Sequence, residues 1–191
     1  MYYYNPNTQK KLNRIGLKNA LSCSFPDGTE QVGDWYLLHN GIAPKTIPGQ
    51  SIKPGPIEIV EGQYVQTYVT TGTIDTCKAA YLEILHNTWL AAEANGTVTV
   101  DGITIDATSR SNRDIEGLII SMEAQGIGST VFCAADNSFH EVTLQQLKDF
   151  RLAVIGLGQR LYARKWELRT AIEAAETLED LEAITISFEG V

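Results

Sequence analysis

The stretch from Thr73 to Ile184 constrains the fold most, because segments with a helical hydrophobic period alternate in it with segments typical of β-hairpins. In the helical segments apolar residues recur every three or four positions, which places them on one face of each helix. The hairpin segments instead alternate β-branched and polar residues around short turns. The predicted helices cover residues 74–94, 109–125 and 144–175, with a short one beginning at Thr177.

Turn residues place two hairpins between these helices. Residues 97–105 alternate around Asp101-Gly102, and an Asp-Gly turn is the strongest short-range hairpin signal. Residues 130–133 and 139–142 are predicted to pair across Asp136-Asn137-Ser138. Ile186 and Phe188 suggest a last strand. Segment 73–191 is therefore predicted to be an α+β domain in the order helix, hairpin, helix, hairpin, long helix, short helix.

Capping residues mark the ends of the predicted helices. Asn95-Gly96 is a C-cap, Ser109 to Ser111 offer N-caps, and Thr143 caps the longest helix. Gly156 and Gly158 interrupt that helix and each costs about 1 kcal/mol relative to Ala. These glycines therefore predict either a kink or a close approach of another helix.

The longest helix is apolar on two sides. Tyr162 and Trp166 are four residues apart on a second face, where Ile155 and Arg169 also fall. This face either packs into the core or binds a partner, because a helix apolar on two sides needs two surfaces to bury against. The first face repeats at heptad spacing and consists of Leu144, Leu147, Val154, Leu161, Leu168 and Ala175.

Residues 1–72 lack a long helical period and are predicted to form a small β-rich module. Residues 35–38 and 64–69 read as strands, and Asp27-Gly28 and Glu61-Gly62 as turns. Segment 44–56 is rich in Pro and Gly and is predicted to be an extended arm at the edge of a sheet. This arm is either a partner-binding element or a surface loop; its candidate contact residues are Pro44, Pro48, Pro54 and Pro56.

Tyr2, Tyr3 and Tyr4 stand together at the N-terminus. Tyrosine is enriched at interfaces because it offers a large, fairly rigid contact area with a polar tip. The three residues are therefore candidates for partner binding, and pairing within the chain's own β-module is an equal alternative.

The charge distribution narrows the classes of partner. Residues 1–72 carry six Lys or Arg against five Asp or Glu, whereas residues 73–191 carry nine against eighteen. An acidic body without a basic stripe argues against nucleic acid. No run of about 18 apolar residues is present, so we expect no membrane partner and a cytoplasmic location.

The residues that usually carry chemistry are scattered. Cys23, Cys77 and Cys133 form no CxxC pair and are expected to be buried free thiols, and the three histidines match no metal-ligand spacing. The motifs of phosphate-binding loops and hydrolase nucleophiles are absent. We therefore predict no catalytic residue, no metal and no cofactor, and hence a protein that is not an enzyme.

A family resemblance follows from these turns, caps and periods. The segment from about Thr73 to Ile184 resembles a domain of uncharacterised function found in bacteriophage tail and tail-fibre proteins, and the preceding segment looks like the modules joined to that domain in phage genes. The resemblance covers about four fifths of the chain. Its residues are Asn95-Gly96, Val98–Asp106, Ser109-Arg110, Asp136-Asn137, Thr143-Leu144, Leu168–Ala175 and Thr177–Leu181, preceded by Trp35-Tyr36, the Pro-rich arm and Glu58–Val69.

The resemblance implies a tail-fibre-associated protein that binds a fibre chain, as an assembly chaperone or as a cap or adaptor retained in the virion. Its expected partners are tail-fibre or baseplate proteins, and homo-oligomerisation stays open. Its expected location is the host cytoplasm during assembly, or the virion tail. The alternative is a stoichiometric structural component of the tail or baseplate. A glycan-hydrolysing enzyme is a remote alternative, which would need two carboxylates about 5–9.5 Å apart in a cleft.

Overall fold

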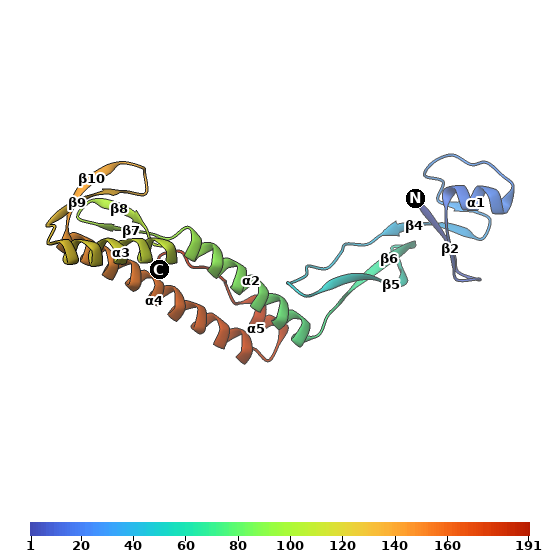
Figure 1. Cartoon of the computed structure of the whole chain (residues 1–191). Coiled ribbons are helices and arrows are strands. Elements are labelled where there is room, and N and C mark those ends of the chain that lie inside the picture. Colours follow the sequence, from blue (N-terminus) through green and yellow to red (C-terminus); the bar gives the residue numbers. More distant parts are fainter. The chain divides into compact units, whose positions relative to one another are not determined.

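The computed structural model describes every residue from Met1 to Val191 and divides into two compact units, Met1–Thr76 and Cys77–Val191. The first unit is built on a sheet with one short helix. The second is built on helices and carries two separate hairpins (Figure 1). The predicted α+β class is thus confirmed. No helix combines the length and the apolar character that crossing a membrane would require.

The sheet of the first unit has the strand order β2-β1-β4-β6-β5, and β3 also pairs with β4. Neighbouring strands are antiparallel except for β4 and β6. The two strands predicted from the sequence are confirmed as β4 and β6, whereas the other four were not delimited. The strands are β1 (Tyr2–Asn5), β2 (Lys10–Asn13), β3 (Gln31–Val32), β4 (Trp35–Asn40), β5 (Ser51–Val60) and β6 (Gln63–Thr71).

A small core lies between this sheet and helix α1 (Arg14–Leu21), which the sequence analysis missed. Tyr3 and Leu17 are fully buried in it, and the Tyr3 ring meets the edge of Phe25 at 5.4 Å between centroids. The Asn13 side chain begins α1 by accepting a hydrogen bond from the Gly16 amide. Residues 2–4 therefore pair within the chain's own sheet. This was one of the two alternatives predicted for the three tyrosines.

The Pro-rich arm is extended along the sheet edge, as predicted, but only in its second half. Strand β5 begins at Ser51 and is the last strand of the sheet, whereas residues 41–50 form no regular element. Pro54 and Ile57 flank a bulge, where a strand can accept proline because its ladder is already broken. The turn to β6 is Glu61-Gly62, and both residues have positive φ, as a tight hairpin turn requires.

In the second unit the helices lie alongside one another, with both hairpins at one end and the short helix α5 at the other (Figure 1). Asp101-Gly102 forms the first hairpin turn with positive φ at both residues. The Ala135 amide donates to the Thr104 carbonyl oxygen at 2.9 Å and thereby joins the two hairpins. The elements are α2 (Ile74–Ala94), β7 (Thr97–Val100), β8 (Ile103–Asp106), α3 (Ser109–Gln125), β9 (Ser129–Cys133), β10 (Phe139–Thr143), α4 (Leu144–Ala174) and α5 (Leu178–Glu182).

Helix caps agree with the sequence in most places. Thr143 begins α4 in a capping box with Gln146, and Thr177 begins α5 in the same way. The predicted cap for α3 at Ser109 to Ser111 is wrong: Thr108 has the extended backbone of an N-cap, and its side chain accepts from the Ser111 amide. Gly156 and Gly158 do not interrupt α4, which continues through both residues and shows no bend in Figure 1.

The predicted heptad face of α4 lies in the core of the second unit, and Phe150 and Leu157 extend it. The expected last strand at Ile186 and Phe188 is wrong; each hairpin is a separate two-stranded sheet, and Phe188 packs its ring against the core instead. The expected burial of all three thiols is also wrong, because only Cys77 is buried, on the inner face of α2. Cys23 and Cys133 are exposed, after α1 and at the end of β9.

Candidate partner-binding surfaces

Five tyrosines gather on the face of the first unit's sheet that α1 does not cover. Side chains alternate along a strand, so burial of Tyr3 against α1 places Tyr2 and Tyr4 on the opposite face. Tyr4 lies opposite Tyr36 in the pairing of β1 with β4. We call this set the tyrosine face: Tyr2, Tyr4, Tyr36, Tyr64 and Tyr68.

Ring contacts hold the tyrosine face together. The Tyr64 ring lies 4.9 Å from that of Tyr36 and 5.6 Å from that of Tyr4, between centroids. The Tyr68 hydroxyl donates to Asn40 Oδ1 at 3.2 Å. Tyr2 is half exposed, and the Lys11 ammonium lies 5.0 Å from its ring centroid. The face is therefore an ordered aromatic surface rather than a frayed terminus.

Strand β5 extends this face with apolar side chains. In the register with β6, Pro54 lies opposite Tyr68, and Ile59, which is 67% exposed, lies opposite Tyr64. The bulge between them is fixed by Gln66, whose amide donates to the Gly55 carbonyl oxygen at 2.8 Å and whose carbonyl accepts from Lys11. Gln66 is nearly fully buried. This role could not be predicted from the sequence, because only the strand pairing reveals it.

The candidate prolines are not brought together. Pro54 lies on the tyrosine face and Pro56 lies in the bulge, where its carbonyl oxygen accepts from the Thr67 hydroxyl at 2.6 Å. Pro44 and Pro48 lie in the irregular segment 41–50, which also holds the almost fully exposed Ile42. Tyr3 is no longer a candidate for partner binding, because its side chain is buried in the core.

In the second unit, the candidate residues Tyr162 and Trp166 lie on the outer side of α4 and are about half exposed. The Tyr162 ring contacts Trp89 of α2 at 5.2 Å between centroids, and the Lys165 ammonium lies 3.5 Å from the Trp89 ring centroid. The Arg169 guanidinium lies over Trp166 at 5.3 Å. Part of the Tyr162 side chain therefore packs against α2 within the chain, whereas more than half of Trp166 faces solvent.

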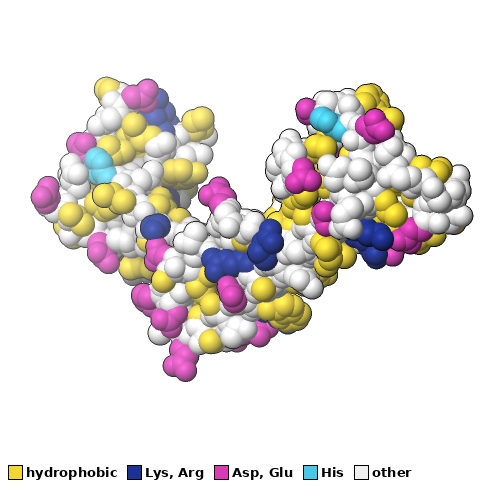
Figure 2. All heavy atoms as spheres, turned by 90° about the vertical axis from the view of Figure 1, so that its left-hand side faces the viewer, with side chains coloured by type: hydrophobic (Ala, Val, Ile, Leu, Met, Phe, Trp, Pro, Cys, Tyr) yellow, Lys and Arg dark blue, Asp and Glu magenta, His cyan; other side chains and the backbone are white.

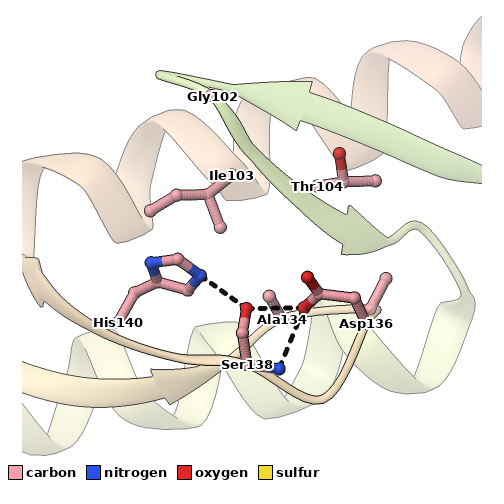
Figure 3. A pocket seen from close by; sticks show the side chains of 8 residues that line it. Gly102, Ile103, Thr104, Ala134, Asp136, Ser138 and His140 are labelled. Carbon is pink, nitrogen blue, oxygen red and sulfur yellow. Dashed lines mark hydrogen bonds between the residues drawn. The ribbon is translucent and has the colours of Figure 1, made fainter.

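A hollow of about 420 Å³ lies between the two hairpins (Figure 3). Ile103 and Thr104 of β8 line one side, and Asp136, Ser138 and His140 line the other. The Ser138 hydroxyl lies 2.5 Å from Asp136 Oδ1 and 2.7 Å from His140 Nε2. Asp136 and Ser138 were predicted to form a turn, and no contact of either residue with His140 was predicted.

The positions of the protons on Asp136, Ser138 and His140 decide whether this cluster could act as a hydrolytic triad. Hydrogen bonds from the Ser138 side chain, and next from its backbone, hold the pKa of Asp136 below its usual value of 3.8. Asp136 is therefore ionised at neutral pH and accepts the Ser138 proton, so His140 Nε2–H donates to the hydroxyl oxygen. A hydrolytic triad needs the reverse, with the imidazole accepting the proton of the serine. The cluster is a side-chain-stabilised turn.

Charged side chains are spread over the surface rather than concentrated in one patch. Figure 2 shows acidic side chains scattered over the visible face, with hydrophobic side chains exposed between them. No group of three or more His, Cys, Asp or Glu side chains is placed to hold a metal ion. That the chain is not an enzyme and takes no cofactor stays a prediction.

Comparison with protein families matched residues 77–186 to the model described as Domain of unknown function (DUF4376). The match covers more than half of the chain and nearly all of the second unit. The chain belongs to the DUF4376 family. Comparisons with curated proteins and with solved structures gave no match.

Some candidate surfaces lie within the DUF4376 domain and the others precede it in the sequence. The DUF4376 domain contains Tyr162, Trp166 and the hollow between the hairpins. The tyrosine face and the prolines precede it. A contact made by the tyrosine face therefore belongs to the first unit, and a property of the DUF4376 domain itself must come from α2 to α5 and the two hairpins.

Proposed function

We propose that this chain is a bacteriophage tail-fibre-associated protein that binds a fibre chain, as an assembly chaperone or as a cap retained in the virion. The sequence resemblance to phage tail and tail-fibre proteins supplies the phage context. The observation that carries the binding role is the tyrosine face, an aromatic sheet surface opposite the side on which α1 packs, with Tyr2 half exposed and the other four tyrosines partly exposed.

The chemistry of this face suits a protein partner. Each tyrosine offers apolar ring area at a low cost in side-chain entropy, and its hydroxyl can bond a polar group of the partner. Ile59 adds exposed aliphatic area beside Tyr64. At the edge, Pro54 and Pro56 remove two amide donors from β5 and so discourage the addition of a further strand. Binding is therefore through side chains on the face.

The proposal places the protein in the host cytoplasm during tail assembly, in contact with a fibre or baseplate chain. Co-expression with a tail-fibre chain from the same genome, followed by size-exclusion chromatography, tests this. We expect the two chains to elute together. Separate elution, with the fibre chain assembling equally well alone, would refute the proposal.

A matched pair of variants tests the surface itself. Tyr2→Ser with Ile59→Ser removes exposed apolar area from the tyrosine face, and we expect co-elution to be lost. The control is Ile15→Ser with Leu21→Ser, which removes exposed apolar area from α1 on the other side of the sheet. Equal loss of binding in both variants would show that the tyrosine face is not the contact.

Mass spectrometry of purified virions distinguishes the two forms of the proposal. A chaperone is absent or substoichiometric in the particle, whereas a cap is present in a fixed ratio to the fibre. A fixed ratio to the baseplate, together with no affinity for the fibre chain, would instead establish the alternative of a structural tail component.

A further inference from the structure

Helix α4 carries two heptad seams, and its own chain covers only one of them. The first seam faces the core and contains Leu147, Phe150, Val154, Leu157, Leu161, Leu168 and Ile172. The second is spaced alternately by four and three residues over more than three heptads, as in a coiled coil. We call it the outer seam: Lys148, Leu152, Ile155, Gln159, Tyr162, Trp166, Arg169 and Glu173.

The middle of the outer seam is apolar and exposed. Leu152 is 67% exposed, Trp166 55%, Tyr162 50% and Ile155 37%. Ile120 of α3, itself 60% exposed, lines a hollow of about 370 Å³ together with Leu152 and Ile155. Large apolar side chains in a row along one helix are costly to leave in water, and such a row marks an interaction surface.

Two glycines beside this seam point to a partner that approaches closely. A Cβ placed on Gly158 would meet no atom within 4 Å, and one on Gly156 would meet only Arg160 Nη1, at 3.5 Å. Neither glycine is therefore needed for packing within the chain, and neither interrupts the helix. Each still costs about 1 kcal/mol relative to Ala. Small residues at such positions let a second helix lie close to the backbone.

We infer that the partner is α4 of a second copy of this chain, antiparallel to the first, about a two-fold axis that passes between residues 160 and 161. In this register Ile155 meets the other copy's Trp166, and Gln159 meets its Tyr162. Gly158 is level with the other copy's Ala163, and these small residues leave room for the two large rings. The two-fold axis repeats each of these contacts, as a self-complementary interface requires.

Charge fixes the direction of pairing. The outer seam ends in a cation, Lys148, and in an anion, Glu173, and antiparallel pairing brings them together at both ends of the interface. Parallel pairing would place each of them against its own like charge, which is destabilising. Lys148 already pairs with Glu123 at 2.7 Å, and Glu173 with Arg169 at 2.7 Å, so each end becomes a network of charges.

The interface is long enough for a specific dimer. The seam from Lys148 to Glu173 spans about 39 Å of helix at 1.5 Å per residue. Ile120 flanks it and adds apolar area from α3. A second copy fits this surface because Ile155 meets Trp166, Gln159 meets Tyr162 and Lys148 meets Glu173, while the aliphatic part of the Arg169 side chain meets Leu152.

Sedimentation of the full-length chain tests the inference. We expect a dimer that dissociates on dilution. Trp166→Glu, and separately Leu152→Arg, which would face the other copy's Arg169, should convert it into a monomer with unchanged helix content by circular dichroism. The control Phe139→Glu changes a residue that is 73% exposed on β10 and should leave the dimer intact. A wild-type chain that stays monomeric up to about 100 µM would overturn the inference, since specific protein interfaces of ordinary size bind in the micromolar range or tighter.

Cysteine cross-linking tests the direction. In a Cys23→Ser, Cys133→Ser background, the pair Lys148→Cys with Glu173→Cys should oxidise to a covalent dimer, and neither cysteine alone should do so. A disulfide needs Cα atoms about 4.4–6.8 Å apart, and antiparallel pairing keeps equivalent residues at the helix ends far from each other. A covalent dimer formed by either single variant would overturn the antiparallel arrangement.

Discussion

Gly158 gives the sharpest test of how α4 is built. Replacing it by Ala adds one methyl group at a position where no atom lies within 4 Å. The gain is then the difference in helix propensity alone, about 1 kcal/mol in the free energy of unfolding. Gly156→Ala should give a similar gain, because its only near neighbour is the flexible end of Arg160 at 3.5 Å. Together they should add about 2 kcal/mol, or roughly 8 °C in the melting temperature for a domain of this size.

Urea unfolding followed by circular dichroism at the helix band measures this, because α2 to α5 hold most of the helical residues. All variants are made on Trp166→Glu, so that self-association does not contribute to the unfolding free energy. Ala163→Gly, on the exposed side of the same helix, is the mirror control and should lose about 1 kcal/mol. A loss of stability in Gly158→Ala, beside the expected loss in the control, would show that the site is not open space within the chain.

Three further predictions follow from single contacts. Thr143→Ala removes the capping box of α4 and should cost about 1–2 kcal/mol, whereas Thr143→Ser should restore most of it; both are read by urea unfolding. Phe150→Ala, at a fully buried position, should cost about 3–5 kcal/mol, against less than about 1 kcal/mol for Leu152→Ala in the monomeric background. The Asp136 carboxylate should titrate below 3.8 by NMR and return toward that value in Ser138→Ala; its contribution to stability is present above this pH and is lost as the pH falls through its lowered pKa.

Local patterns in the sequence were sufficient for the second unit. The Asp-Gly turn and the β-branched residues around it predict the first hairpin, and the heptad period of α4 predicts most of its buried face. These signals are local, since a two-residue turn and a helical repeat do not depend on distant segments. The N-cap of α3 was misplaced by one residue, because Thr108, Ser109 and Ser111 all carry a hydroxyl that can cap a helix, and only the backbone angles identify Thr108.

The first unit shows where local patterns fail. Strands β1 and β2 have four residues each, and β1 is held by pairing with β4 some thirty residues away. The tyrosine face depends on that pairing, because it decides that Tyr3 enters the core while Tyr2 and Tyr4 stay outside. The three residues are identical in the sequence, so composition alone could not divide them between a core and a surface.

The two proposed surfaces make a joint prediction that neither makes alone. A dimer through α4 carries two tyrosine faces, so it can engage two copies of a fibre chain on a densely coated sensor surface. The second contact then forms at a high effective concentration, which raises apparent affinity by about 10²–10⁴-fold where the geometry permits it. Trp166→Glu should therefore weaken binding to a dense fibre surface by at least about tenfold and leave binding to a sparse surface unchanged. Tyr2→Ser with Ile59→Ser should weaken both. Equal losses on dense and sparse surfaces for Trp166→Glu would mean that Trp166 contacts the fibre directly, which would contradict the assignment of the outer seam to a second copy.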